Sequence, residues 1–223
     1  MKRIKLYSIL LIVISVLLLQ NCEPDHETPD VSIVSELAKF EYVGGQFISF
    51  VKGTVAAYDE PGVYAFVGDK EFDVTSRTLE PVNPNKEGVY IYEYFAENDE
   101  GIVSKGRRIV AVTTEDVRNN EDLSGKYVTY GFGVAVEAKV KKKNDIGWYS
   151  CSEVLGYPGV EVNGEFVDIG DGVLYILPGD SYFGKYDLYK GNYTFTSLSW
   201  DILFIEPPND GVLIPVTLIK SED

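Results

Sequence analysis

Short runs of β-branched and aromatic residues, separated by turn-forming residues, fill most of this chain beyond residue 40. In the second half such runs occupy residues 126–140, 147–153, 160–162, 166–169, 173–177, 186–189, 193–201, 202–205 and 212–219. Gly, Pro-Gly and Asn-Gly steps between them are typical of turns between strands. No amphipathic helical period of useful length appears. The chain is therefore expected to be all-β, and residues 119–223 to form an antiparallel barrel or sandwich that hides its strand edges.

The first half holds one clear hairpin. Residues 88–96 alternate in a β pattern, residues 97–101 are polar and end in glycine, and residues 102–113 alternate again. At a period of two, one face of the first strand carries Tyr90, Tyr92, Tyr94 and Ala96. This face could stack on sugars or pack in a core, and its register favours the core.

These motifs resemble the carboxy-terminal hairpin of bacterial immunoglobulin-like surface domains. In that family a Gly-x-Tyr-x-Val-x-Tyr-x-Ala strand meets an Asn-x-x-Gly turn and returns through an Arg-x-Val-x-Val strand. Here Tyr92 takes the place of the valine, and the likeness covers residues 40–113. The resemblance implies an immunoglobulin-like β-sandwich for residues 31–118, and such domains usually act as spacers. A polar run at residues 114–122 marks the boundary, near residue 118, with the second domain, residues 119–223.

The amino terminus has the three-part layout of an export signal. Lys2, Arg3 and Lys5 precede an apolar run at residues 6–19, and Gln20-Asn21-Cys22 follows. The run is shorter than the ~20 residues that a membrane-spanning helix needs. Residues 1–21 resemble a lipoprotein signal peptide, which implies a diacylglycerol on the Cys22 thiol and no disulfide with the remaining Cys151. An ordinary secretory signal is the alternative.

Residues 22–30 are acidic, contain two prolines and are expected to be a solvated tether. In the lipoproteins that this segment resembles, acidic residues after the anchor cysteine imply display on the outer face of the outer membrane, rather than in the periplasm. The expected location is therefore the outer membrane, with the lipid anchor as the membrane contact and the protein facing the cell exterior.

Charge excludes one class of partner. The formal net charge is −15, and removing residues 1–21 takes away three cations and no acids, which makes it −18. Such a balance opposes binding to nucleic acid or to anionic lipid head groups. The one basic cluster, Lys139 with residues 141–143, is expected to be a solvated hairpin end rather than a docking patch.

The second half carries both tryptophans and nine of the sixteen tyrosines. Aromatic faces suit sugar rings, because C–H groups pack on the π surface while hydroxyls stay hydrated. Loop-rich segments place aromatics beside glycines, and the candidate ligand-binding residues are Trp148, Tyr149, Tyr157, Tyr182, Phe183 and Tyr186. For each of them core or rim packing is the competing interpretation. This part also resembles the carboxy-terminal domain of uncharacterised lipoproteins of polysaccharide-utilisation systems, a likeness that brings no established site.

Enzyme chemistry finds little support in the sequence. The only histidine, His26, lies in the tether, so a serine or cysteine triad within a domain is excluded. No phosphate-binding glycine loop, metal-binding histidine pair or Cys-x-x-Cys is present, and the aspartates of residues 168–172 are explained by turns. We expect no catalytic residues, no metal and no cofactor.

Three functions remain. The leading one is a surface lipoprotein that binds a polysaccharide or oligosaccharide, or assists outer-membrane uptake proteins that do so. A structural or adhesive surface protein is the second, and a lipocalin-like carrier with a ligand inside the barrel is the third. An exposed aromatic cluster on a loop face favours the first, a surface poor in aromatics the second, and an open apolar cavity the third.

Overall fold

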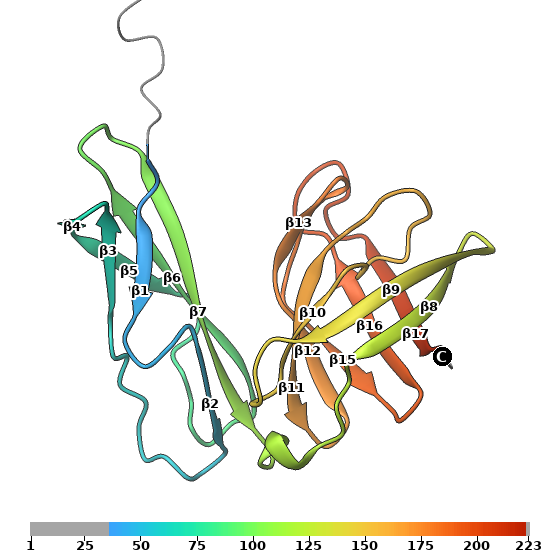
Figure 1. The fold of residues 1–223 in the computed structure, drawn as a ribbon. Coiled ribbons are helices and arrows are strands. Elements are labelled where there is room, and N and C mark those ends of the chain that lie inside the picture. Colours follow the sequence, from blue (N-terminus) through green and yellow to red (C-terminus); the bar gives the residue numbers. More distant parts are fainter. Residues whose placement is uncertain (1–35, 222–223) are drawn as a thin grey trace, which may run out of the picture. The chain divides into compact units, whose positions relative to one another are not determined.

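The computed structural model describes residues 36–221, so the predicted signal peptide, Cys22 and the tether lie outside the described residues. Figure 1 shows that the described part is built from strands, with one short 3₁₀-helix, η2 (Val117–Asn119). The predicted all-β class is confirmed. No helix in residues 36–221 is long and apolar enough to cross a membrane.

The first seven strands form two sheets. The smaller sheet has the order β1 (Lys39–Tyr42), β3 (Val63–Val67), β4 (Lys70–Phe72). The larger has the order β2 (Phe47–Val51), β7 (Val103–Thr113), β6 (Gly88–Glu97), β5 (Val74–Thr78). Strand β2 runs parallel to β7, and every other pairing in these two sheets is antiparallel.

The predicted hairpin is the pair β6 and β7, with Tyr90 opposite Val110. Asn98 closes its turn, because its side-chain oxygen accepts hydrogen bonds from the backbone N–H groups of Glu100 and Ile102. Tyr90 and Tyr94 are buried and Tyr92 is half-buried. Core packing of this tyrosine face, predicted from its register, is confirmed.

Strand β7 ends at Thr113 and β8 begins at Gly125, so the predicted boundary at residue 118 falls on η2. The segment between them is anchored to the second half, since the Thr114 N–H donates to the Ile169 carbonyl. Residues Leu37–Asp223 group as one unit by their contacts. The division into two independent domains stays a prediction.

The second half forms a closed antiparallel barrel of eight strands in the order β10, β11, β12, β15, β16, β17, β8, β9. Their bounds are β8 (Gly125–Gly131), β9 (Val134–Lys142), β10 (Trp148–Cys151), β11 (Gly164–Gly170), β12 (Val173–Ile176), β15 (Tyr189–Tyr193), β16 (Ser197–Leu203) and β17 (Leu213–Lys220). A separate hairpin joins β13 (Gly179–Ser181) to β14 (Gly184–Tyr186). Closure removes the unpaired edges, which decides between the barrel and the sandwich that the sequence left open.

Several predicted strand limits were wrong. The run at residues 126–140 is two strands, because a tight turn at Phe132 and Gly133 splits it into β8 and β9. Residues 160–162 lie in a loop, and the two runs at 193–205 share a single strand, β16. Each error comes from a segment where apolar residues continue through a turn or a strand, so hydrophobicity alone does not mark the limits.

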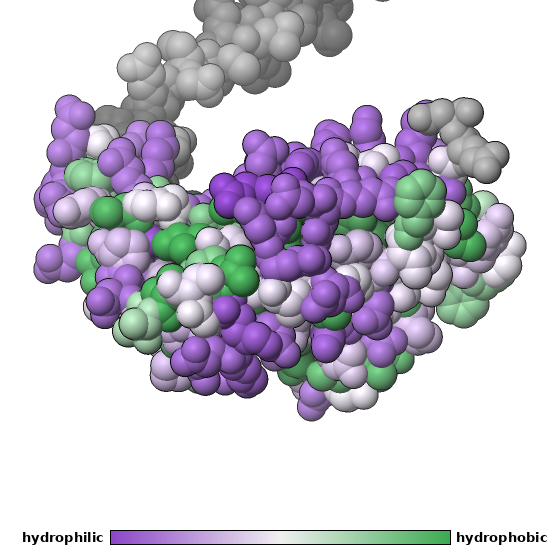
Figure 2. Space-filling model, turned by 90° about the horizontal axis from the view of Figure 1, so that it is seen from below, coloured by the Kyte–Doolittle hydropathy of each residue, from purple (hydrophilic) through white to green (hydrophobic). Residues whose placement is uncertain are grey.

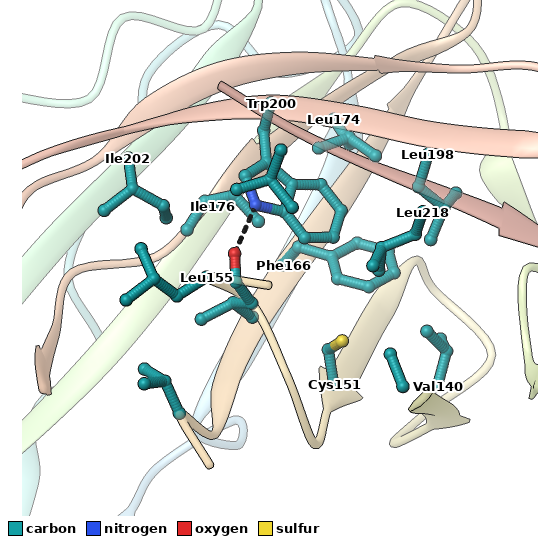
Figure 3. Close-up of a cluster of buried hydrophobic side chains, with 14 of the residues drawn as sticks. Val140, Cys151, Leu155, Phe166, Leu174, Ile176, Leu198, Trp200, Ile202 and Leu218 are labelled. Carbon is teal, nitrogen blue, oxygen red and sulfur yellow. Dashed lines mark hydrogen bonds between the residues drawn. The ribbon is translucent and has the colours of Figure 1, made fainter. Parts of the chain in front are cut away.

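Alternate residues of the barrel strands fill its interior. Leu198, Trp200 and Ile202 of β16 point inward, and the Trp200 indole N–H donates to the Val154 carbonyl at 2.8 Å (Figure 3). Phe166 of β11 packs between Tyr149 and Trp200, with ring centroids at 5.1 and 5.9 Å. These side chains leave no water-sized space in the apolar site that Val154, Ile202 and Phe204 border. The barrel is a packed core.

Strand β11 is buried on both faces, because its outward residues Val167 and Ile169 pack against β6 and β7 of the larger sheet. Phe47 of β2 stacks on Trp148 of β10 in the same cluster, with centroids 5.4 Å apart and planes 10° apart. At ~25 cal/mol per Å² of buried apolar surface, contacts of this kind stabilise the association of the sheet with the barrel wall.

Candidate functional site

The candidate ligand residues divide into two groups in the structure. Trp148, Tyr149 and Tyr186 are buried: Trp148 lies against Phe47, while Tyr149 and Tyr186 belong to the barrel core. A buried ring presents no face to a sugar, so for these three candidates the structure favours core packing, the competing interpretation. The reason is tertiary, because strand pairing turns them toward neighbours that are distant in sequence.

Tyr157, Tyr182 and Phe183, in contrast, lie together and are joined by a residue that the sequence reasoning missed, Phe132. Ring centroids are 5.3 Å apart for Phe132 and Tyr157, 4.8 Å for Tyr157 and Phe183, and 5.5 Å for Phe183 and Tyr182. We call Phe132, Tyr157, Tyr182 and Phe183 the aromatic loop cluster. Phe132 is 84% exposed and Tyr182 is 87% exposed, while the two middle rings are half-buried and pack on the barrel core.

Three loops at one end of the barrel supply these rings. The β8–β9 turn carries Phe132, the loop of residues 152–163 carries Tyr157, and the β13–β14 turn carries Tyr182 and Phe183. The first two loops touch closely, since a Cβ atom on Gly131 would lie 2.1 Å from the Gly156 carbonyl oxygen. Only glycine at position 131 therefore allows this approach.

Phe132 occupies an unfavourable backbone conformation. Its φ is +49° and that of Gly133 is +77°, the left-handed values of a two-residue hairpin turn. Asn, Asp and Gly are the usual residues at such positions, and a bulky residue there is a strained outlier. A large, exposed apolar ring at a strained position is not explained by turn formation, which points to a role outside the fold.

The loop of residues 152–163 is organised by a buried carboxylate. Glu153 accepts hydrogen bonds from the N–H groups of Leu155, Gly156 and Val162, at 2.9, 2.8 and 3.2 Å. Burial raises the pKa of Glu153, and the three N–H donors oppose that shift. Because one side chain satisfies three backbone donors, the loop that carries Tyr157 has a defined shape.

The β13–β14 turn is held in a similar way. The Ser181 hydroxyl accepts from the Phe183 N–H at 3.1 Å and donates to the Gly184 carbonyl at 2.9 Å. The Asn209 side chain, from the β16–β17 loop, donates to the Phe183 carbonyl at 2.6 Å. Phe183 also meets Phe204 of the barrel core, with centroids at 6.5 Å. The aromatic loop cluster is thus a preformed surface with a rigid base.

Other apolar residues around the same end of the barrel are exposed, namely Tyr130, Val134, Ile205, Val212 and Leu213. Figure 2 views the molecule from below, the side away from the β13–β14 hairpin in Figure 1, and on this side hydrophobic residues form small groups among hydrophilic ones. A gathering of aromatic rings at one loop end marks a place where a ligand or partner can bind.

The structure of residues 36–221 adds no candidate residue for nucleophilic catalysis or metal binding. Cys151 is buried in the barrel core, and desolvation raises the pKa of its thiol to about 12. Within residues 36–221 no three His, Cys, Asp or Glu side chains are grouped so as to hold a metal ion. The candidate site is accordingly the aromatic loop cluster.

No protein-family model and no curated protein match this sequence. Among solved structures, the chain is similar to the crystal structure of a lipoprotein from Bacteroides thetaiotaomicron, with 22% sequence identity and a TM-score of 0.35. The match covers 83% of this chain and 100% of that chain. At this level of similarity the superposition assigns neither a family nor an activity.

Proposed function

We propose that this protein is a non-catalytic surface lipoprotein that binds a glycan through the aromatic loop cluster of its barrel. The observation that supports it most is the chain of four touching rings from three loops, of which the two outer rings are largely exposed. Sugar rings stack on such faces, because their C–H groups pack on the π surface while their hydroxyls stay hydrated.

The rigid base of the cluster adds to this argument. A surface that is ordered before binding loses less conformational entropy when the ligand arrives. Glu153, Ser181 and Asn209 fix the backbone on both sides of the rings. The strain at Phe132 fits the same function, because unfavourable backbone geometry persists mainly where a function requires it.

The carrier function finds less support, because the interior of the barrel is filled by its own side chains. A structural or adhesive role at the cell surface is the second candidate, and the same exposed rings favour it if the partner is a protein. Outer-membrane anchoring through a lipid on Cys22, exposure on the cell exterior and assistance to uptake proteins are part of the proposal and rest on the sequence of residues 1–30.

The test is a glycan-array and calorimetric screen of soluble residues 31–223 with the Phe132→Ala/Tyr182→Ala variant beside the wild type. Phe195→Ala is the matched control, because Phe195 is 76% exposed and lies in the β15–β16 turn, at the other end of the barrel. Saturable binding that the double variant loses and the control keeps supports the proposal. Absence of binding to plant, host and microbial polysaccharides would favour the adhesive role.

A further inference from the structure

A groove of about 410 Å³ lies on the outer wall of the barrel. Its lining includes several small residues, Ser150, Ser152, Gly164 and Gly179. The groove and the aromatic loop cluster share two elements: the ends of the loop of residues 152–163 and the base of the β13–β14 hairpin line the groove, while the middle of the loop and the tip of the hairpin carry rings of the cluster. A chain-like ligand that extends along these elements would contact both.

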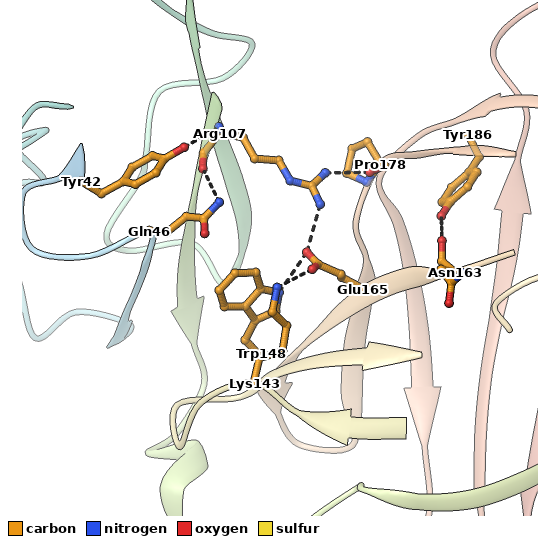
Figure 4. A network of polar contacts seen from close by, with 9 residues as sticks. All are labelled: Tyr42, Gln46, Arg107, Lys143, Trp148, Asn163, Glu165, Pro178 and Tyr186. Carbon is orange, nitrogen blue, oxygen red and sulfur yellow. Dashed lines mark hydrogen bonds and ion pairs between the residues drawn. The ribbon is translucent and has the colours of Figure 1, made fainter. Parts of the chain in front are cut away.

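Cations line this groove. Lys139 and Lys141 of β9 are exposed on its rim, and Arg107 of β7 reaches it from the larger sheet. The one acid among the lining residues, Glu165, is already neutralised, because its carboxylate pairs with Arg107 at 3.0 Å and with Lys143 at 2.5 Å (Figure 4). Within residues 36–221 no carboxylate forms an ion pair with Lys139 or Lys141, so their charges are uncompensated.

The polar groups of the groove are mostly hydrogen-bond donors. The Ser152 hydroxyl accepts from the Lys139 N–H, which leaves its own hydrogen available. The Asn163 backbone carbonyl accepts from the Tyr186 hydroxyl at 3.4 Å, and the side-chain amide of Asn163 has no partner within residues 36–221. Ammonium, hydroxyl and amide donors together match the oxygens of an anionic group.

We propose that this groove binds the carboxylate or sulfate groups of an acidic glycan that also stacks on the aromatic loop cluster, an inference that rests on the proposed function. The net charge of −15 does not prevent this, because charges farther than ~8 Å are largely screened at physiological ionic strength. At shorter range the lining of the groove presents two cations without a carboxylate partner in residues 36–221, Lys139 and Lys141, while the charges of Arg107 and Glu165 offset each other.

The proposal departs from the sequence-based expectation for the basic cluster. Lys142 and Lys143 do behave as a solvated strand end, since they pair with Asp145 and Glu165. Lys139 and Lys141 of β9 line the groove. The ion pairs of residues 36–221 thus divide one sequence cluster into two paired and two unpaired lysines.

The experiment measures binding of oligogalacturonate, a sulfated galactan oligosaccharide without carboxylates and a neutral malto-oligosaccharide of equal length to residues 31–223. The variant is Lys139→Ala/Lys141→Ala. The matched control is Lys39→Ala/Lys190→Ala, which removes the same charge from two other exposed lysines. We expect an acidic probe to bind best, and the groove variant to lose at least about tenfold in affinity and to show a weaker salt dependence. The carboxylate and sulfate arms identify which anion is bound.

Equal binding of the neutral and acidic probes, or equal losses in both lysine variants, would overturn the acidic-glycan inference. If binding then still depends on Phe132 and Tyr182, the proposed function stands without it. If the wild type binds no glycan at all, both the proposed function and the acidic-glycan inference fail. Circular dichroism and urea unfolding of each variant confirm that losses do not come from misfolding.

Discussion

Arg107 of β7 and Glu165 of β11 form an ion pair, with 3.0 Å between Nη2 and Oε2, that joins the larger sheet to the barrel wall. Arg107 also donates to the Pro178 carbonyl, and the Trp148 indole N–H reaches the same carboxylate at 3.3 Å. Because both side chains are only partly exposed, the pair is less screened than a surface ion pair. It positions Arg107 at the edge of the groove.

A double-mutant cycle measures this pair. We expect Arg107→Ala and Glu165→Ala each to lower the free energy of unfolding, with a coupling energy of about 1 kcal/mol, because the pair is intermediate between exposed and buried. The exposed pair Lys70 and Asp99 serves as the control and should show a coupling near zero. Equal coupling in the two pairs would contradict the structural role of Arg107.

The adjacent Arg108 has a different role. It is 0% exposed, donates to the carbonyls of Val43 and Gly62 at 2.8 Å, and lies 3.2 Å from Glu60, which also accepts from Tyr94. Arg108→Met should lower the free energy of unfolding by about 3–5 kcal/mol, because it leaves a carboxylate and two carbonyls without their cation. Urea unfolding measures the loss, and a loss comparable with that of Lys105→Met, on the exposed face of β7, would contradict this account.

We expect Phe132 to lower the free energy of unfolding while it contributes to glycan binding. Left-handed geometry costs a non-glycine residue ~1–2 kcal/mol, and asparagine tolerates it best. The contact with Tyr157 offsets part of this cost, because an aromatic pair contributes ~0.5–1.5 kcal/mol and this ring is mostly exposed. Phe132→Asn should therefore raise the free energy of unfolding by about 0.5 kcal/mol and reduce glycan binding. A clear loss of stability in urea would show that Phe132 serves the fold.

Asp168 should make stability depend on pH. It is 1% exposed, and burial raises its pKa despite hydrogen bonds from Gly170, Asn120 and Tyr193. The folded protein thus keeps this proton to a higher pH than the unfolded chain does. The stability that protonation provides is complete below the unfolded pKa and is lost as the pH rises through the folded pKa.

Asp168→Asn isolates this effect, because the amide can satisfy the same neighbours after the Asn120 side chain turns over. As the pH rises above about 4, the ordinary pKa of an aspartate, and through the raised pKa of the folded protein, the wild type should lose stability relative to the variant. Parallel unfolding curves for the two proteins across this range would show that Asp168 is not responsible. Asp210→Asn, at an exposed position of the β16–β17 loop, provides the reference for a carboxylate without this burial.

The sequence predicted those features that local patterns encode. The β6–β7 hairpin followed from alternation and an Asn-to-Gly turn, and an antiparallel barrel or sandwich followed from the number of short strands, of which the structure has the barrel. Tyr157, Tyr182 and Phe183 were identified by their glycine neighbours. Phe132 was missed because Gly131-Phe132-Gly133 sits inside a run that reads as one strand, although two flanking glycines were a usable turn signal.

Contacts between residues distant in the sequence could not be predicted from local sequence patterns. Trp148 is buried because Phe47, in another sheet, stacks on it, and no local sequence pattern predicts that contact. The groove likewise combines Arg107 of β7 with Lys139 of β9 and Glu165 of β11, which the chain brings together only after the barrel closes. The sequence shows the lysines as a cluster, but only the three-dimensional structure shows which of them form ion pairs.

The most direct test of the central claim is hydroxyl-radical footprinting of residues 31–223 with and without the best-binding glycan. We predict that the ligand protects Phe132, Tyr157 and Tyr182 while leaving Phe195, which is 76% exposed, unchanged. Protection confined to other surfaces, or the absence of any glycan that binds, would contradict the assignment of the aromatic loop cluster as a carbohydrate site.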